Sequence, residues 1–305
     1  MHSTESPHPI HVPVLPQEIL SWLAPRPGMI LVDGTLGGGG HTRLLAEKLA
    51  GDGYVLALDR DPAALAAAEK NLAGLPVKIA QSNFCDLADV LDELEVPAVD
   101  GVLLDLGLSS DQLADESRGF SFDASGELDL RFNPDEGEPA WRLLARLEER
   151  EIADLIYKFG EERCSRRIAR RIVEARAEGP LKSVKDIAAL VRRCVPRSPK
   201  ERIDPATRTF QALRIAVNRE LESLELALAR IPDRLKPGGR LAIISFHSLE
   251  DRLVKEAFRN DLRLEPLTKK PVIATEEETA RNPRARSAKL RVAARTEVKV
   301  RSTEY

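Results

Sequence analysis

The chain has 305 residues, of which 43% are hydrophobic and 31% charged, and its formal net charge is −3. These values are typical of a globular protein with one large domain or two smaller ones. No apolar run is long enough to span a bilayer, and the polar, proline-rich residues 1–14 lack the pattern of a secretory signal, so we expect a cytoplasmic protein. The three cysteines, Cys85, Cys164 and Cys194, are far apart and favour neither a disulfide framework nor a metal site.

The first third of the chain alternates between apolar strand patterns and helical patterns. Strands are predicted over residues 29–34, 54–59, 77–84 and 99–107, and helices over residues 41–50, 61–74 and 86–94. Pro62 at an early helical position and Gly74 beyond the last turn support the bounds of the second helix. This alternation predicts an α/β fold with a mostly parallel sheet and helices on both faces.

The alternation stops near residue 112 and resumes near residue 215. Residues 115–139 are rich in Gly, Pro, Asp and Asn and are predicted to form a loop. Helices are predicted for the residues that follow, over 152–159, 165–176 and 183–195. We therefore expect a helical domain at residues 113–214, inserted between residues 1–112 and 215–305 of the α/β domain.

One long helix is predicted to return the chain to the α/β domain. Asp204 and Pro205 suit its N-cap and first position, and its apolar face continues from Phe210 to Leu228. A strand over residues 238–247, a helix over 248–260 and a late strand over 288–298 follow. Residues 267–287 are too mixed in composition to assign.

Positive charge is concentrated in the predicted insertion. Residues 161–219 hold 16 Lys and Arg against 7 Asp and Glu, although the whole chain is acidic. A locally basic segment of this kind favours a polyanionic partner, with solvated helix faces as the simpler alternative.

Four consecutive glycines, Gly37 to Gly40, follow the first predicted strand and lead into a helix. Ligands of open parallel sheets bind beyond the C-terminal ends of the strands, and bare glycine backbone lets N–H groups approach them closely. Asp59 ends the second strand, where an acid can accept both hydroxyls of a ribose. The pattern predicts a nucleoside cofactor, either a dinucleotide or S-adenosylmethionine (SAM). Asp59 could instead be a helix N-cap, and His41 an early polar residue of the helix.

A series of longer motifs makes the chain similar to one family. The motifs run in order from about His11 to Arg295, as HVPVL, DGTLGGGGHT, ALDRDP, LLDLGLSSDQL, RGFSF, LDLR, YKFGEER, PATRTFQALRIAVNREL, LKPGGRLAIISFHSLEDRLVK and NPRARSAKLRVAAR. Together they resemble the bacterial small-subunit ribosomal RNA methyltransferase H family (RsmH, formerly MraW). The resemblance covers nearly the whole chain.

The resemblance implies a Rossmann-like, class I SAM-dependent methyltransferase with an inserted helical domain. It implies methyl transfer to the exocyclic N4 of a cytosine in the decoding region of 16S ribosomal RNA, near the P site of the small subunit. Carried onto this sequence, the family's cofactor contacts are Gly39, Gly40, His41, Asp59, Phe84, Asp105 and Gln112. The oligomeric state is left open, with a homodimer as one alternative.

The residues after the fourth and fifth strands suggest how such a transfer could be catalysed. Cytosine N4 is a poor nucleophile because its lone pair is delocalised into the ring, so a site must orient the amino group and accept its proton. We expect Asp105, with Ser109 in the turn that follows, to take this role. His247 is a further catalytic candidate, while Ser248 could cap the next helix with Asp251 as its partner.

Basic and aromatic residues of the insertion and the tail are candidates for binding RNA. The arginines expected to contact phosphates are Arg163, Arg166, Arg167, Arg170, Arg171, Arg281, Arg284 and Arg286. Phe120 or Phe122 could stack on a base or simply pack in the insertion, and Phe84 could pack on adenine or in the core. Two rival functions stay open from the residues alone: a NAD-dependent oxidoreductase, and a ribosome-assembly protein that binds RNA without catalysis.

Overall fold

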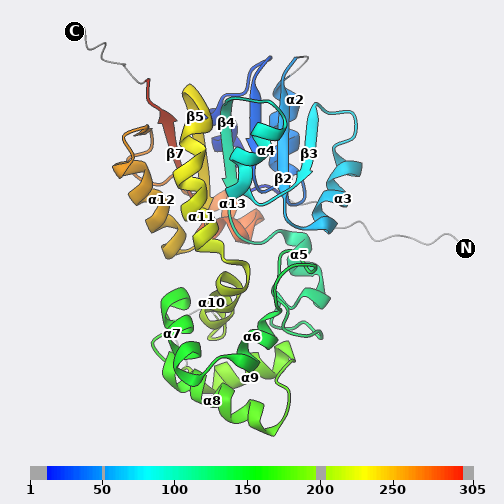
Figure 1. The fold of residues 1–305 in the computed structure, drawn as a ribbon, viewed down its shortest axis with the longest axis vertical. Helices are drawn as coiled ribbons and strands as arrows, with labels where there is room; N and C mark the ends of the chain where they lie inside the picture. The colour runs from blue at the N-terminus through cyan, green and yellow to red at the C-terminus, as the bar shows by residue number, and fades with distance from the viewer. Residues whose placement is uncertain (1–11, 50–51, 197–203, 298–305) are drawn as a thin grey trace, which may run out of the picture. The chain divides into compact units, whose positions relative to one another are not determined.

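A computed structural model describes residues 12–49, 52–196 and 204–297. The chain divides into two compact units, Met1–Ser109 with Ser223–Tyr305, and Ser110–Glu222. Figure 1 shows the strands gathered in the first unit and a group of helices in the second. Across the described part of the chain, we find no helix with the length and apolarity needed to cross a membrane.

The described residues of the first unit form a seven-stranded sheet. Its strands are β1 (Ile30–Asp33), β2 (Tyr54–Asp59), β3 (Val77–Gln81), β4 (Val99–Asp105), β5 (Leu235–Ser245), β6 (Leu264–Pro266) and β7 (Lys289–Arg295). Their order in the sheet is β3-β2-β1-β4-β5-β7-β6, in which β1 to β5 are parallel while β7 is antiparallel to both β5 and β6. The predicted Rossmann-like α/β fold is thereby confirmed.

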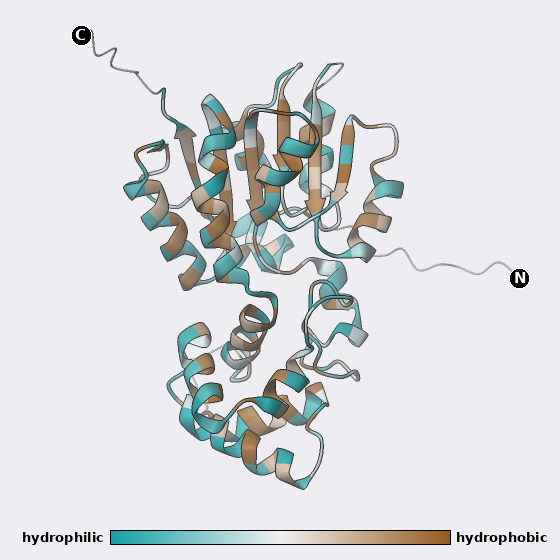
Figure 2. Ribbon diagram, viewed as in Figure 1, coloured by the Kyte–Doolittle hydropathy of each residue, from teal (hydrophilic) through white to brown (hydrophobic). Residues whose placement is uncertain are grey.

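Helices cover both faces of the sheet because its strands are apolar on both sides. One face packs on α1 (Pro16–Leu23), α2 (Gly40–Leu49) and α3 (Pro62–Asn71), and the other on α4 (Leu87–Glu93), α11 (Glu220–Arg230) and α12 (Ser248–Asn260). Neighbouring strand residues therefore enter different cores, as Leu103 and Leu104 do. Figure 2 shows the resulting brown, hydrophobic strands between helices that are teal on their outer sides.

The parallel strands bring several polar residues to one edge of the sheet. β1, β2 and β4 end in Asp33, Asp59 and Asp105, and Asp105 is in register with Ile244, one residue before the end of β5. C-terminal ends of parallel strands are where ligands bind in such folds. This edge therefore carries the candidate site.

The segment left unassigned by the sequence forms helix α13 (Glu276–Arg281) and the 3-10 helix η4 (Pro283–Ser287). Glu278 accepts a hydrogen bond from the backbone N–H of Leu15 at 2.7 Å, and Asn282 donates to the carbonyl of Val12 at 3.1 Å. Ala285 lies in the hydrophobic core with residues of α1 and α2. The segment is thus fixed to the rest of the first unit by both polar and apolar contacts.

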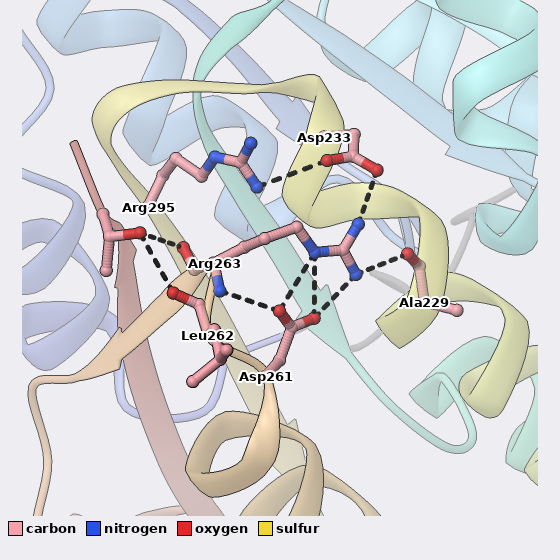
Figure 3. A network of polar contacts seen from close by, with 7 residues as sticks. Ala229, Asp233, Asp261, Leu262, Arg263 and Arg295 are labelled. Carbon is pink, nitrogen blue, oxygen red and sulfur yellow. Dashed lines mark hydrogen bonds and ion pairs between the residues drawn. The ribbon is translucent and has the colours of Figure 1, made fainter. Parts of the chain in front are cut away.

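A charged network holds the antiparallel edge of the sheet (Figure 3). Arg263 pairs with Asp261 at 2.6 Å and with Asp233 at 2.5 Å, and it donates to the carbonyl of Ala229 at 2.9 Å. Arg295 of β7 approaches Asp233 at 3.3 Å. The network connects the end of α11 to β7. Because Asp233 is exposed, the ion pairs that it makes contribute little to stability.

The second unit is helical, as predicted. Its helices are α5 (Ser110–Ala114), α6 (Ala140–Arg146), α7 (Glu149–Gly160), α8 (Ser165–Glu178), α9 (Val184–Cys194) and α10 (Thr207–Asn218). Ile152 and Ile156 of α7 and Ile168 and Ile172 of α8 are fully buried, so the apolar stripes read from the sequence form the core of this unit.

The prediction of one long helix after Asp204 is wrong. α10 begins at Thr207, and Asp204 lies before it, accepting from the N–H of Ala206 and pairing with Arg192 at 2.7 Å. The helix then breaks at Arg219, whose φ of 52° is left-handed, before α11 begins.

Asn218, the last residue of α10, makes long-range contacts directly before the break. Its buried side chain accepts from the N–H of Phe132 at 2.7 Å and donates to the carbonyl of Leu130 at 2.7 Å. These contacts pair backbone polar groups of the loop between η2 (Glu116–Arg118) and α6. Helix propensity reflects neighbouring residues only, so it does not report a contact with this distant loop.

We predict that Asn218→Ala destabilises the protein by about 1–3 kcal/mol, because it leaves the buried carbonyl of Leu130 and the partly buried N–H of Phe132 without these partners. The free energy of unfolding measured in urea tests this. The control, Asn260→Ala at the exposed end of α12, should change it by less than about 0.5 kcal/mol. Equal effects of the two substitutions would contradict the role given to Asn218.

Candidate active site

The glycine loop after β1 needs its glycines for specific reasons. Gly37 and Gly39 have φ values of 47° and 77°, which side chains rarely adopt. A Cβ on Gly39 would also lie 3.3 Å from Leu72, and one on Gly34 would lie 2.5 Å from Leu104. The loop is closed by a hydrogen bond from Gly39 N–H to the Leu36 carbonyl at 2.8 Å. Gly40 then begins α2, so the loop leads directly to a helix N-terminus.

Asp59 faces this loop. Its carboxylate accepts from the N–H of Gly37 at 2.8 Å and from that of Asp61 at 2.9 Å. Burial raises its pKa, although these backbone donors act in the opposite direction. The alternative of Asp59 as a helix N-cap is wrong, because Asp61 caps α3 by accepting from the N–H of Ala63 at 3.0 Å.

Asp33, which sequence reasoning did not single out, links the two sides of the loop. Its buried carboxylate accepts from the Thr42 hydroxyl at 2.7 Å on α2, and from the N–H and hydroxyl of Thr35 at 3.1 and 3.3 Å. Burial raises the pKa of Asp33 to about 6. The one signal in the sequence for this role was the position of the acid, directly before Gly34 at the start of the loop.

Asp105 ends β4 beside this loop, and its side chain is buried. Its backbone N–H donates to the Thr35 hydroxyl at 2.7 Å, and its Oδ2 lies 3.7 Å from Nε2 of His41. Its Oδ1 is buried and makes no hydrogen bond to any described residue.

The charge state of Asp105 is set by its surroundings. Burial raises its pKa to about 7; Arg284 acts against this rise, whereas Asp33 and Glu250 add to it. A carboxyl with a pKa near neutrality can exchange a proton at physiological pH.

Two further predicted residues lie beside the loop. A Cβ on Gly37 would be 3.5 Å from the Cβ of Ser109, and one on Gly34 would be 3.0 Å from the Cβ of Phe84. Phe84 does not end β3 but follows it in the 3-10 helix η1 (Phe84–Asp86), partly buried against the core. Gln112 belongs to α5 of the second unit, and its contact with a cofactor stays a prediction.

His247 is the N-cap of α12, and the expected cap by Ser248 with Asp251 is wrong. His247 accepts from the N–H of Glu250 through Nδ1 at 3.4 Å, while Glu250 accepts from the N–H of His247 at 3.2 Å. Asp251 instead pairs with Arg291 at 2.7 Å. The imidazole Nε2 also lies 3.1 Å from Glu250, so His247 has a structural role whatever it does in catalysis.

The residues at this edge fit SAM better than a dinucleotide. Asp59 can accept a ribose hydroxyl, since its carboxylate has about four acceptor positions and the backbone N–H groups of Gly37, Arg60 and Asp61 do not fill them all. Three buried acids, Asp33, Asp59 and Asp105, surround the loop, and they would favour a cationic sulfonium and repel a pyrophosphate. The buried Oδ1 of Asp105 offers an acceptor that no residue of the described ranges occupies.

We predict that Asp105→Asn makes the protein more stable near about pH 8, by on the order of 2–4 kcal/mol, because ionising this buried carboxyl destabilises the folded state. The pKa of Asp105 is higher in the folded than in the unfolded protein, so the wild type loses stability relative to the variant as pH rises from about 4 to about 7.

Urea unfolding of both proteins across this pH range measures the difference. The matched control is Asp52→Asn, which changes an exposed acid and should leave the pH dependence unaltered. A constant difference at all pH values would show that Asp105 does not ionise as described.

Comparison with known proteins identifies the family of this chain. The model of the MraW methylase family matches residues 8–296, of which residues 8–11, 50–51 and 197–203 lie outside the described ranges. The chain is 53% identical to the ribosomal RNA small subunit methyltransferase H of Rhodopirellula baltica, over 94% of this chain and 92% of that protein. It is 54% identical to the protein of the same name from Prochlorococcus marinus (93% and 89%), and 50% identical to that from Pelobacter propionicus (92% and 97%). The chain therefore belongs to the MraW methylase family, and it is a methyltransferase whose methyl donor is SAM.

Proposed function

We propose that this methyltransferase modifies the exocyclic N4 of a cytosine in the decoding, P-site region of 16S ribosomal RNA within the small subunit. The names of the relatives support a small-subunit ribosomal RNA substrate. The observation that carries the choice of an amino group is Asp105, a buried acid near its ionisation point with one oxygen unpaired among the described residues. A cytoplasmic location and the homodimer alternative stay predictions.

Residues from the loop and the strand ends would hold the cofactor. Gly39, Gly40 and His41 lie at the N-terminus of α2 and would contact the cofactor there. Asp59 would accept the ribose hydroxyls, and Phe84 would flank the adenine. Asp105 and Gln112 complete the set carried over from the family. Six of these seven residues lie in the first unit, and only Gln112 belongs to the second unit.

Asp105 would orient the amino group and take its proton. SAM, when bound, supplies an electrophilic methyl group and leaves as S-adenosylhomocysteine. The ionised Asp105 accepts a hydrogen bond from N4 and receives the proton that N4 loses as its bond to the methyl carbon forms and the sulfur–carbon bond breaks. Ser109, which lies beside the glycine loop, would assist in orienting the base. His247 would act mainly by holding α12 in place.

The insertion, residues 113–214, would bind the RNA. The arginines predicted for this role are exposed on and just before α8: Arg163, Arg166, Arg167, Arg170 and Arg171. Arg171 pairs with Glu174 and Arg170 approaches Glu149, while the cluster as a whole stays strongly positive. Base stacking by the insertion's phenylalanines is less favoured, because Phe122 packs edge-on against Phe210, with ring centroids 4.9 Å apart, and Phe120 is buried beside Phe132.

Membership of a methylase family excludes the NAD-dependent oxidoreductase. The other rival, RNA binding without catalysis, predicts no transfer at all, so the assay below distinguishes it.

We predict that small subunits from a strain lacking this methyltransferase, incubated with the protein and radiolabelled SAM, yield label only in N4-methylcytidine at one decoding-region position. Asp105→Asn should bind SAM yet lower the rate by about 100-fold or more, because general acid–base and orienting roles are typically worth this much. Label in another nucleoside would overturn the choice of N4. Full activity of the Asp105→Asn protein would overturn the proton-acceptor role.

We predict that the double variant Arg166→Ala/Arg167→Ala binds a decoding-region RNA fragment with a shallower salt dependence. Two lost phosphate contacts should reduce the slope of log K against log salt by about 1.4–1.8. The matched control, Arg26→Ala/Arg259→Ala, removes two exposed arginines of the first unit. If the control changes the slope equally, the arginines of α8 are not a specific RNA-binding surface.

A further inference from the structure

The three arginines near η4 are not equivalent. Arg281 and Arg286 are exposed, and Arg281 only approaches Glu277 at 3.4 Å. Arg284 is partly buried; its Nη2 donates to the carbonyl of Leu108, and its guanidinium lies 6.0 Å from the ring centroid of Phe246. Arg284 is therefore directed into the first unit, whereas its neighbours face solvent.

The backbone that carries Arg284 is firmly placed. The residue lies in η4, between Asn282, which donates to the Val12 carbonyl, and Ala285, which is buried in the core. Glu278 of the preceding helix binds the N–H of Leu15. These contacts fix where the guanidinium can reach.

Arg284 reaches the turn that carries the candidate catalytic residues. Leu108 lies between Asp105 and Ser109, so the bond to its carbonyl restrains the turn after β4. The charged and titratable groups that face Asp105 are His41, at 3.7 Å, together with Asp33, Glu250 and Arg284. Desolvation, Asp33 and Glu250 all favour the protonated carboxyl, and Arg284 favours the ionised one.

We propose that Arg284 is a positioning residue of the methyl-transfer site, which holds the turn after β4 through Leu108 and lends positive charge to the carboxyl of Asp105, rather than a contact to RNA phosphates. The effect of Arg284 on the reaction rests on the proposed function, because only there is Asp105 a proton acceptor. The effect of Arg284 on the carboxyl of Asp105 does not rest on that function.

Carbon-13 NMR of the aspartate carboxyls in the cofactor-free protein tests this directly. Asp105→Asn identifies the resonance, and the titration is repeated in Arg284→Met, Arg284→Lys and Arg286→Ala. We expect Arg284→Met to move the midpoint upward by about one pH unit. Arg284→Lys should move it less because it keeps the charge, and Arg286→Ala should not move it. A midpoint unchanged in Arg284→Met, with an unaltered thermal unfolding temperature, would overturn the proposal.

The pH dependence of methyl transfer then separates the two hypotheses. With Arg284→Met, the acid limb of the rate profile should move upward with the NMR midpoint, so activity falls about five- to tenfold near about pH 7 and recovers near about pH 9. A merely structural loss would lower activity equally at all pH values and leave the NMR midpoint in place, which would contradict the proposal. If the NMR midpoint moves but the rate profile does not, Arg284 acts on Asp105 as inferred, and the proton-acceptor role in the proposed function fails.

Discussion

The carboxylate of Asp33 is enclosed in the protein and accepts hydrogen bonds from Thr35 and Thr42, which lie on the two sides of the glycine loop. Because Thr35 also accepts from the N–H of Asp105, a single buried acid connects β1, the loop, α2 and β4. These hydrogen bonds hold Thr35 between the carboxylate of Asp33 and the backbone N–H of Asp105. The cofactor edge is therefore a hydrogen-bonded unit rather than a set of independent side chains.

Gathering acids at one edge is electrostatically unfavourable for the empty protein. After burial itself, Asp59 adds to the raised pKa of Asp33, and Asp33 adds to that of Asp105. The sheet, packed on both faces, provides the stability that permits this arrangement. Under the proposed function the same repulsion is useful, since it favours a cationic methyl donor and adjusts Asp105 to exchange a proton near neutral pH. Arg284 limits how far that adjustment goes.

The features that could be predicted from the sequence are those that local patterns determine. Alternating apolar strands and helices predicted the α/β fold, and the glycines with Asp59 and Asp105 indicated the edge of the sheet proposed to bind the cofactor. The errors concern contacts between distant segments. Asn218, the last residue of α10, is bonded to a loop 86 residues away, and a helical pattern holds no information on such a contact. His247 caps α12 in place of Ser248, and Arg284 turns inward because its segment is anchored to Val12 and Leu15. Asp33 escaped notice because an acid before a glycine loop has no role until Thr35 and Thr42 are seen around it.

Under the proposed function, SAM binds through Asp59 at the edge formed by β1, β2 and β4. Calorimetric titration of SAM into the wild type, Asp59→Asn and the exposed control Asp52→Asn tests it most directly. The account predicts at least about tenfold weaker binding for Asp59→Asn, because hydrogen bonds to a charged acceptor are worth about 1.5–3 kcal/mol. It predicts no change for Asp52→Asn. Wild-type affinity in a correctly folded Asp59→Asn protein would contradict the account, because SAM would then have to bind elsewhere or without this acid.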